Sequence, residues 1–310
     1  MNRNMAIIIP GFKREYLKQT LNSIFSMKKI ELANVYVFDD NSPNELYEIC
    51  NHYENKDNFK YHRYNENYGG KDLVAQWNRC VRDTKENWVW LFSDDDIVTE
   101  NCLVNFFESL KNNSHKYTVY RFNTKIISKN GRVIKSNPAH PNIETSINYI
   151  ESKLRFEKIG FVTEFIFHRE IFDNVNGYVS FPRAWNSDDA TILKFGKYSK
   201  IFTIKGSFVY WRLSDINISS VLETDMHKLY NSSKLYIKWL TDKGFFKQKY
   251  QKVLLRRYYI QQFTYIYGFS FKSLHNLMID WKKFWNESTF SFVISFLDLL
   301  WIKIKNKICI

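Results

Sequence analysis

The sequence predicts an α/β protein in which a mostly parallel sheet is flanked by helices and is followed by a helical C-terminal extension. Three observations carry this prediction. Continuously apolar runs alternate with stretches of helical periodicity in the first half of the chain, and several of these runs end in polar or acidic residues. The last part of the chain is helical in pattern, aromatic and basic. Alternation of this kind is typical of parallel strands that are joined and covered by helices.

The first half contains three apolar runs that predict buried strands, at residues 6–9, 35–38 and 88–92, and a further strand is expected at 59–64. Between them, apolar residues recur at helical spacing, as in Leu17, Leu21 and Ile24. A helix-like stretch also ends at Ile49, and another carries Leu73, Trp77 and Cys80. Ligands of open parallel sheets bind outside the carboxyl ends of the strands. The polar residues that follow these strands are therefore the first candidates for a site.

The second half has a mixed pattern. Residues 117–123 and 126–134 predict strands, with a hairpin around Asn130 and Gly131. Further strands are expected at 165–167 and 200–210, and the pattern is helical after residue 226. We therefore expect a sheet domain over residues 1–225, with a first half to about 115 and a second half from 116, and a helical extension over 226–310.

The composition excludes several classes of protein. Of 310 residues, 45% are hydrophobic, which is too many for a disordered chain, and 10 Gly with 5 Pro exclude collagen-like sequence. The net charge is +13, and residues 226–310 contribute +11 of it, from fifteen Lys or Arg and four Asp or Glu. A basic, aromatic segment of this kind favours an anionic partner, either a phospholipid surface or a nucleic acid.

The cysteines and the apolar segments indicate the cellular compartment in which the protein is expected. Cys50, Cys80, Cys102 and Cys309 have no paired spacing and no zinc-site pattern, so we expect reduced thiols in the cytoplasm. The N-terminus has no signal-peptide pattern. The apolar stretch 292–304 includes Asp298 and Lys303 and is shorter than the roughly 20 residues of a transmembrane helix.

Two acidic clusters follow predicted strands. Asp94, Asp95 and Asp96 come directly after residues 88–92, and adjacent carboxylates repel one another unless a cation or several donors neutralise them. Clustered oxygens suit Mg²⁺ or Mn²⁺, although a solvated turn that caps the next helix is an alternative. Asp39 and Asp40 follow residues 35–38 and either form an Asx-turn or accept hydrogen bonds from a nucleotide.

Four motifs together resemble those of family 2 glycosyltransferases. The first is Ile7 to Arg14, an apolar strand that runs into Pro10, Gly11, Phe12 and two basic residues. The others lie at Val37–Ser42, at Asn65–Gly70 with Gln76–Cys80, and at Trp90–Ile97, which resembles the D-x-D metal motif; all four occur in family order. The resemblance covers roughly residues 5–220, most closely up to residue 100.

The resemblance implies a GT-A fold, a Rossmann-like, mostly parallel sheet that uses a nucleotide-diphosphate sugar and Mn²⁺ or Mg²⁺. A UDP-sugar is the expected donor. By the same resemblance, the base and ribose are held by Pro10, Phe12, Asp39 and Asp40, with Arg79 in their vicinity. The resemblance assigns the metal and, through it, the diphosphate to the carboxylates at 94–96. The literal D-x-D motif is Asp94 and Asp96. If the chain is aligned on a D-x-D-D pattern instead, Ser93 stands at the first Asp and Asp95 at the second, with Asp94 beside it. We favour this second alignment, in which Asp95 and Asp94 act on the donor.

Inverting transfer also needs a general base, which family members carry in an acidic pair after a Gly-Gly-Phe-like turn. Here Asn176-Gly177-Tyr178 precedes Asp188 and Asp189. We assign Asp189 as the base and Asp188 as its positioning partner or substitute. The alternative is that Asp188 is the N-cap of a helix that starts near Ala190.

Two further residues complete the expected site. Arg212, in a stretch that resembles the family's late active-site border, is expected to pair with the diphosphate, with a surface ion pair as the alternative. His227 is a candidate additional metal ligand in a closing loop, although an isolated His is more often not a ligand.

The basic extension carries aromatic residues among its lysines and no nucleic-acid motif, so we expect a membrane-surface helix and no nucleic-acid partner. The alternative is a helical cap that buries these rings. The predicted protein is a metal-dependent, inverting transferase that moves a sugar to a hydroxyl of a glycan or lipid-linked acceptor for surface polysaccharide. It would lie in the cytoplasm on the inner face of the membrane. A sugar nucleotidylyltransferase and a non-catalytic nucleotide-sugar or polyanion binder are the alternatives.

Overall fold

The computed structural model describes residues 3–215, 226–268 and 270–308, with side chains described up to residue 300. The chain divides into two compact units. The first comprises residues 1–150 and 158–220, and the second comprises 151–157 and 221–310. Residues 151–157 thus belong to the second unit although they lie within the first in sequence, which no sequence pattern had indicated.

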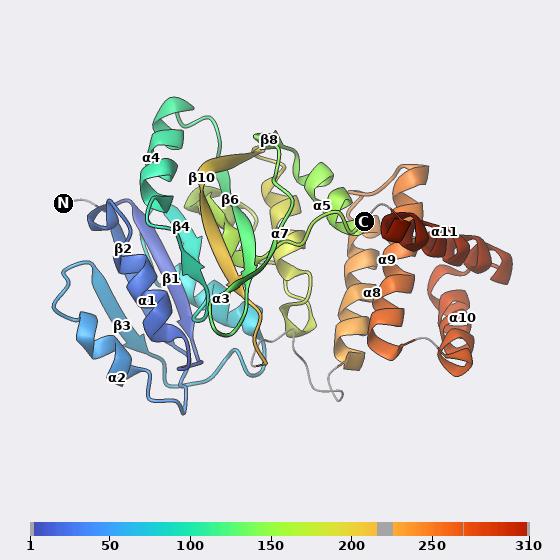
Figure 1. The fold of residues 1–310 in the computed structure, drawn as a ribbon, viewed down its shortest axis with the longest axis horizontal. Coiled ribbons are helices and arrows are strands. Elements are labelled where there is room, and N and C mark those ends of the chain that lie inside the picture. The colour runs from blue at the N-terminus through green and yellow to red at the C-terminus, as the bar shows by residue number, and fades with distance from the viewer. Residues whose placement is uncertain (1–2, 216–225, 269, 309–310) are drawn as a thin grey trace. The chain divides into compact units, whose positions relative to one another are not determined.

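The first unit is built on a sheet of ten strands among the described residues, in the order β3-β2-β1-β4-β9-β6-β10-β5, with β7 beside β6 and β8 beside β10 (Figure 1). The strands are β1 Met5–Gly11, β2 Ala33–Asp39, β3 Phe59–Arg63, β4 Trp88–Leu91, β5 Ile97–Val98, β6 Val119–Ile127, β7 Val133–Ser136, β8 Ile143–Glu144, β9 Phe165–His168 and β10 Ile201–Arg212. The helices that cover or join them are α1 Leu17–Phe25, α2 Tyr47–Cys50, α3 Leu73–Arg82, α4 Cys102–Asn112, α5 Ser146–Leu154, α6 Arg169–Asn174 and α7 Ser187–Phe195. Short 3₁₀ turns lie at Ile30–Leu32, Asn51–Tyr53, Val162–Glu164 and Pro182–Ala184.

Strands β1, β2, β3 and β4 form the parallel part of the sheet. Ile8 of β1 lies opposite Tyr36 of β2 on one side and Leu91 of β4 on the other. The residues of β1 are almost wholly buried because helices cover both faces, which explains the continuous apolar run. Since these strands are parallel, their carboxyl ends share one edge of the sheet, and the segments after Gly11, Asp39 and Leu91 meet there.

The remaining strands make the sheet mixed. β9 pairs antiparallel with β4 and β6, whereas β10 pairs parallel with β6 and antiparallel with the short β5. β10 is the longest strand, with a register shift between Ile204 and Phe208. This arrangement brings the end of β10 beside the segment that follows β4, so that Tyr210 lies opposite Ile97.

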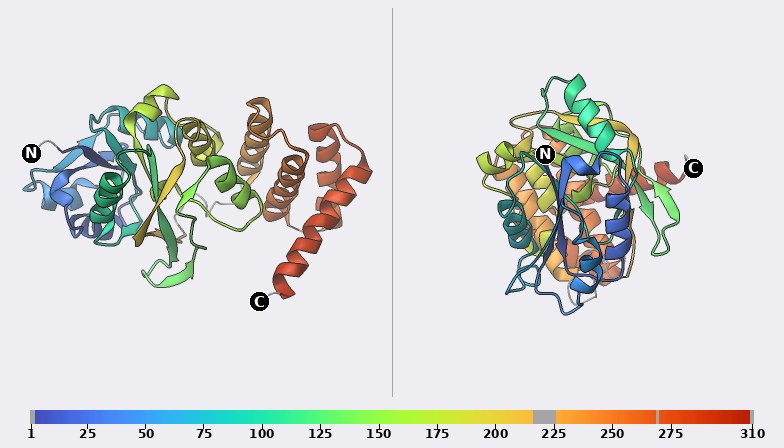
Figure 2. Two further views of the ribbon diagram at one scale, coloured as in Figure 1. Left: turned by 90° about the horizontal axis from the view of Figure 1, so that it is seen from above. Right: turned by 90° about the vertical axis from the view of Figure 1, so that its left-hand side faces the viewer.

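The second unit contains α8 Met226–Asp242, α9 Lys249–Tyr267, α10 Phe271–Trp285 and α11 Thr289–Ile308. α8 and α9 pack side by side as an antiparallel pair, and α10 and α11 follow them (Figures 1 and 2). Asp280 of α10 joins α8, α9 and α10 through hydrogen bonds. It accepts hydrogen bonds from Lys234 Nζ at 2.8 Å, from the Tyr259 hydroxyl at 2.5 Å and from the Tyr230 hydroxyl. Burial alone would raise the pKa of Asp280, but these donors together lower it.

The aromatic residues of the second unit fall into two groups. Trp281 is fully buried and contacts the rings of Tyr259 and Phe292, so part of the aromatic content forms the core of this unit. Other large apolar side chains are exposed, including Phe271 and Phe290. None of the described helices is long and apolar enough to cross a membrane.

These observations confirm the predicted fold class, a mixed and mostly parallel sheet flanked by helices with a helical C-terminal region. The predicted strands and the hairpin after β6 lie where the sequence indicated. The expected boundary at residue 225 falls at the end of 216–225, outside the described residues. The division of the sheet domain at residue 115 stays a prediction.

Candidate active site

The candidate site lies at the carboxyl edge of β1, β2 and β4. Phe12 and Lys13 follow β1, Asp39 ends β2, and Asp94 to Asp96 follow β4. The three segments come from distant parts of the chain, and the parallel register of the strands brings them together.

Asp94 fastens the segment after β1. Its Oδ2 accepts the backbone N–H groups of Phe12 at 2.9 Å and of Lys13 at 2.7 Å. Its Oδ1 lies 3.2 Å from the ammonium of Lys13. Burial raises the pKa of the Asp94 carboxyl above its usual value, against the opposing effect of Lys13.

Asp95 faces the same ammonium. Its Oδ2 is paired with Lys13 Nζ, and its Oδ1 accepts a hydrogen bond from the Ser93 hydroxyl. Burial alone would lower the pKa of Lys13, but Asp94 and Asp95 raise it well above its usual value. Two carboxylate oxygens from neighbouring residues therefore converge on one cation.

Asp96 points into the fold instead. Its Oδ1 accepts the backbone N–H of Arg212 at 2.9 Å, and its Oδ2 accepts the Thr163 hydroxyl at 3.0 Å. The side chain is fully buried, and burial raises its pKa well above the usual value. Asp96 thus joins the segment after β4 to β10 and to the turn before β9.

No group of three or more His, Cys, Asp or Glu side chains is arranged as a metal site among the residues that the structure describes. The Asp94 and Asp95 pair nevertheless fits a hard divalent ion. Mg²⁺ is commonly held by one or two carboxylates, with the remaining ligands from substrate phosphates and water. The convergence of Asp94 Oδ1 and Asp95 Oδ2 on Lys13 Nζ shows that these oxygens can share a cation.

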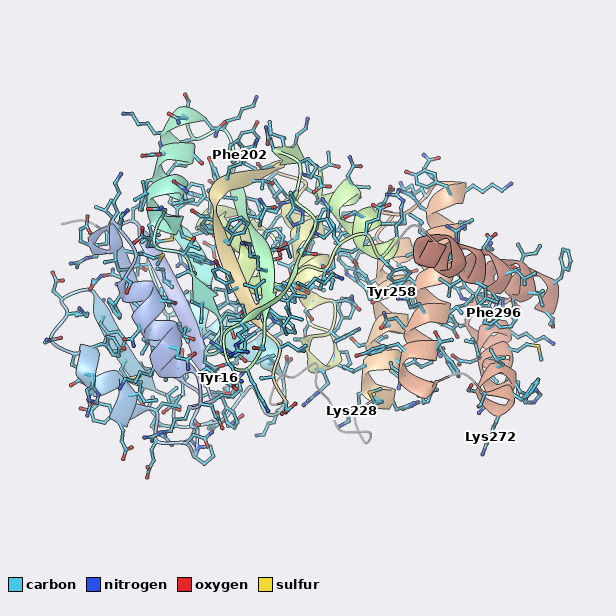
Figure 3. All side chains as sticks on the ribbon, in the orientation of Figure 1. Tyr16, Phe202, Lys228, Tyr258, Lys272 and Phe296 are labelled. Carbon is cyan, nitrogen blue, oxygen red and sulfur yellow. The ribbon has the colours of Figure 1, made fainter. Side chains whose placement is uncertain are left out.

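Arg212 contacts the backbone of the acidic segment. Its side chain is fully buried, which excludes the surface ion pair considered as its alternative. Nε donates to the Asp95 carbonyl at 2.8 Å, Nη1 to the Lys129 carbonyl at 3.0 Å and Nη2 to Gln19 Oε1 at 2.9 Å. The guanidinium also lies 4.3 Å from the centre of the Tyr16 ring, near the end of β10 (Figure 3). Arg212 therefore positions the acidic segment, α1 and the hairpin after β6.

The Asp39 carboxylate is also satisfied by the fold. Its Oδ1 accepts the backbone N–H of Ser42, three residues further on, at 2.7 Å, so this contact spans one residue more than an Asx-turn. Its Oδ2 accepts the Tyr61 hydroxyl at 2.6 Å and Arg63 Nη1 at 2.7 Å. Asp39 is fully buried, so it shapes the edge of the sheet between β2 and β3.

Asp40 and Arg79 hold the loop before α3. Asp40 accepts the backbone N–H groups of Tyr68 at 2.9 Å and of Gly69 at 2.6 Å, and it pairs with Arg79 Nη2 at 2.7 Å. Burial raises the pKa of Asp40. The Arg79 guanidinium lies between two rings, 3.5 Å from the centre of Tyr64 and 3.9 Å from that of Tyr68. A cavity of about 410 Å³ is bordered by Tyr68, Arg79 and Ser180, among others.

Phe12 is a large apolar side chain exposed at this edge, at 40%, while Pro10 is half-buried. The Phe12 carbonyl accepts the Ser42 hydroxyl at 2.6 Å and Asn44 Nδ2 at 2.8 Å. The backbone of Phe12 is therefore held from both sides while its ring stays accessible for stacking.

The acidic pair at 188–189 lies at the start of α7. The helix begins at Ser187, earlier than expected, so both residues are in its first turn and Asn186 is the N-cap. Asp188 is therefore not the cap, contrary to the alternative prediction. Asp189 is almost fully buried, and its Oδ2 is 3.3 Å from Asn186 Nδ2. Carboxylates in a first turn interact favourably with the N-terminal helix dipole.

His227 belongs to the second unit, in the first turn of α8. Its Nδ1 is 2.6 Å from the Tyr267 hydroxyl of α9. This hydrogen bond gives His227 a partner within the helical unit, and its role as a metal ligand stays a prediction.

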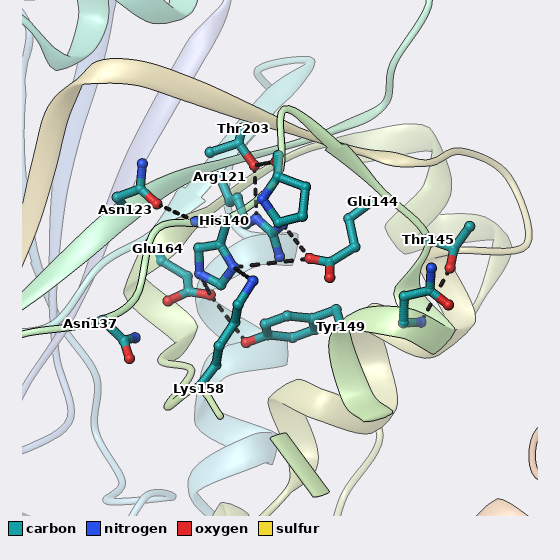
Figure 4. Close-up of polar contacts among 12 residues, drawn as sticks. Arg121, Asn123, Asn137, His140, Glu144, Thr145, Tyr149, Lys158, Glu164 and Thr203 are labelled. Atoms are coloured by element: carbon teal, nitrogen blue, oxygen red, sulfur yellow. Dashed lines mark hydrogen bonds and ion pairs between the residues drawn. The ribbon is translucent and has the colours of Figure 1, made fainter. Parts of the chain in front are cut away.

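Lys13 is the residue whose role the sequence did not reveal. In the sequence, Lys13 is one of two basic residues at the end of the first motif, and the position of its ammonium between Asp94 and Asp95 depends on the fold. Sequence reasoning also missed a buried polar cluster in the second half of the sheet (Figure 4). In it, Arg121 pairs with Glu144 and donates to the Thr203 hydroxyl at 3.1 Å, and the Tyr149 hydroxyl donates to Glu164 at 3.1 Å. No pattern of spacing marks these residues.

Comparisons with known proteins agree with this fold. A crystal structure of S. aureus TarS 1–349 in complex with UDP-GlcNAc is similar over 91% of this chain and 80% of that chain, with a TM-score of 0.66 and 17% identity. A complex of the same fragment with UDP has a TM-score of 0.64 at 17% identity, over the same shares of both chains. No curated protein sequence matches the chain.

These similarities show a GT-A type fold. The sequence profile described as glycosyl transferase family 2 matches residues 6–175, which is more than half of the chain. The chain belongs to glycosyl transferase family 2.

Proposed function

We propose that this protein transfers a sugar from a UDP-sugar to a hydroxyl group of a glycan or lipid-linked acceptor, with inversion at the anomeric carbon and with Mn²⁺ or Mg²⁺. The observation that carries the proposal is the convergence of Asp94 and Asp95 on one cation beside the exposed ring of Phe12. The S. aureus TarS structures, crystallised with UDP-GlcNAc and with UDP, support a UDP-sugar as the donor class.

In this proposal the uridine binds at the edge formed by β1 and β2. The Phe12 ring stacks on the base, with Pro10 beside it. Asp39, Asp40 and Arg79 already have partners in the fold, and so they shape the pocket through β3 and the loop before α3.

Asp94 and Asp95 hold the metal in this proposal, while Asp96 and Arg212 keep them in place through the contacts described above. When bound, the metal neutralises the charge that develops on the departing diphosphate. The hydroxyl of Ser93, which donates to Asp95, orients that carboxylate.

Asp189 is the proposed general base. It removes the proton of the acceptor hydroxyl while that oxygen forms a bond to the anomeric carbon and the bond from this carbon to the diphosphate breaks. The Asn186 amide near Asp189 Oδ2 orients the carboxylate, and Asp188 is its neighbour in the same turn.

The experiment that tests this function is a product assay with a panel of UDP-sugars, candidate acceptors and Mn²⁺ or EDTA. Transfer releases UDP and forms a glycosidic bond. A nucleotidylyltransferase would instead release pyrophosphate from a nucleoside triphosphate, and a binding protein would retain the UDP-sugar without turnover. Either of those outcomes would contradict the proposal.

We further propose that the helical unit attaches peripherally to an anionic membrane surface on the cytoplasmic side. Helix α11 exposes Phe290, Val293, Ile294 and Leu297, at 74%, 42%, 47% and 57%. Their spacing of three and four residues places them on one face of the helix. Because residues 226–310 carry a net charge of +11, this apolar face is surrounded by a basic sequence, as is typical of interfacial helices.

A further inference from the structure

Lys13 occupies the place in the site where the proposed metal would bind. Its ammonium is 3.2 Å from Asp94 Oδ1 and is also paired with Asp95 Oδ2, the two oxygens that the proposed function assigns to a divalent cation. An ammonium and a divalent ion cannot occupy the same position between two carboxylates.

The backbone of Lys13 is fixed where this contact is made. Its N–H donates to Asp94 Oδ2 at 2.7 Å, beside the N–H of Phe12 at 2.9 Å. Asp94 therefore uses one oxygen to hold the backbone of Lys13 and the other to meet its side chain. The flexible four-carbon stem leaves the ammonium as the part of this arrangement that can move.

The charge of the cluster explains why a cation is needed there. Asp94 and Asp95 are each about 4% exposed, and buried carboxylates are costly unless they are paired. Arg212 meets the Asp95 carbonyl and not its carboxylate, so Lys13 is the basic side chain that the described structure places on these carboxylates. The pair is thus neutralised in part without a metal.

We propose that Lys13 is a displaceable counter-ion, which leaves Asp94 and Asp95 when they bind a divalent cation and then pairs with the diphosphate of the donor. This inference rests on the proposed function and goes beyond it. Lys13 would lower the affinity for the metal when no nucleotide is bound. When the metal is bound, Lys13 would raise the affinity for UDP. Since such coupling is reciprocal, binding of the donor would in turn raise the affinity for the metal.

The first test measures Mn²⁺ binding to the full chain without nucleotide. The electron paramagnetic resonance signal of free Mn²⁺ is the readout. We expect Lys13→Met to bind Mn²⁺ roughly tenfold more tightly than the unchanged protein, a factor that corresponds to about 1.4 kcal/mol. Lys13→Arg keeps the positive charge and should stay close to the unchanged protein. Lys18→Met removes an exposed lysine of α1 and is the matched control.

The second test is calorimetric binding of UDP and of uridine at saturating Mn²⁺. Lys13→Met should weaken UDP binding by roughly tenfold and leave uridine binding unchanged, because uridine has no phosphate. Lys13→Gln, which is also neutral, serves if the Met variant does not fold.

Mn²⁺ binding that is unchanged or weaker in the neutral variants would overturn the proposal. Tighter Mn²⁺ binding with unchanged UDP affinity would overturn the transfer of Lys13 to the diphosphate. Both tests are binding measurements, so they separate this inference from the proposed function. If the protein transfers no sugar but Mn²⁺ still competes with Lys13, the transferase proposal fails and the counter-ion proposal holds.

Discussion

Asp96 and Arg212 are 116 positions apart in the chain, and Asp96 Oδ1 accepts the backbone N–H of Arg212 at 2.9 Å. The second oxygen of Asp96 accepts the Thr163 hydroxyl at 3.0 Å. One member of the acidic triplet therefore joins three segments of the first unit, while its two neighbours face Lys13.

This relationship predicts that Asp96→Ala acts mainly on stability. The substitution leaves two buried donors, the Arg212 N–H and the Thr163 hydroxyl, without their acceptor. Each unsatisfied donor costs about 1–3 kcal/mol of stability. We expect a loss of roughly 2–4 kcal/mol in the free energy of unfolding, measured by chemical denaturation. A variant as stable as the unchanged protein would show that Asp96 does not hold these segments together.

Asp95→Asn should instead remove metal-dependent nucleotide binding while the fold survives. The change keeps the size of the side chain but removes the charge that a divalent ion requires. Thermal shift with UDP and Mn²⁺ is the measurement, since a ligand at about 100 times its Kd stabilises by about 2.7 kcal/mol. Full Mn²⁺-dependent stabilisation in this variant would assign the metal to other residues, with Asp94 and Asp96 as the first candidates.

Asp189→Asn should retain donor binding and lose transfer by roughly 10²–10⁴-fold, the usual contribution of a general base. The substitution preserves the shape of the first turn of α7 and its proximity to Asn186. The matched variant is Asp188→Asn in the same turn. If Asp188→Asn shows the large loss and Asp189→Asn remains active, the base is Asp188.

Asp280→Asn should destabilise the protein in a pH-dependent way. The pKa of Asp280 is lowered in the folded chain, so its ionised form stabilises the fold above the unfolded pKa of about 3.9, and this stabilisation is lost as the pH falls through the folded value. We expect a loss of about 1.5–3 kcal/mol near pH 7, the range for hydrogen bonds to a charged group, and a smaller difference in acid. Urea unfolding at several pH values measures both. A difference that does not change with pH would contradict the role of the charge.

Binding to liposomes that contain anionic phospholipid should depend on the exposed face of α11. The double variant Phe290→Ser with Leu297→Ser removes two exposed apolar side chains, each worth about 1.5–3 kcal/mol when fully buried, and should weaken binding at least about tenfold. High salt should weaken the binding of the unchanged protein, because the basic residues act through charge. Tyr265→Ser on α9, also at an exposed position, is the control. A full-length protein that does not bind at low salt, or a double variant that binds equally well, would contradict this attachment.

The alternation of apolar runs and helical spacing was sufficient to predict β1 to β4, the parallel part of the sheet, whereas the two-residue strands β5 and β8 were not predicted. β1 and β4 are buried on both faces, and such strands have a continuous apolar sequence that can be recognised without a structure. The order of the motifs was likewise sufficient for the family, which the match over residues 6–175 confirms. These properties depend on local sequence and on the order of segments along the chain.

The tertiary structure alone decided which side chains of the acidic triplet face the site. Asp94, Asp95 and Asp96 are chemically identical, and their directions are set by partners that lie far away in the chain, namely Lys13 for the first two and Arg212 for the third. The same holds for Arg212, whose guanidinium donates to the carbonyl groups of Asp95 and Lys129, while its expected pairing with a diphosphate stays a prediction. A sequence specifies which residues can pair, but a buried polar group needs a hydrogen-bond partner, and which partner it meets is determined only when the strands are assembled.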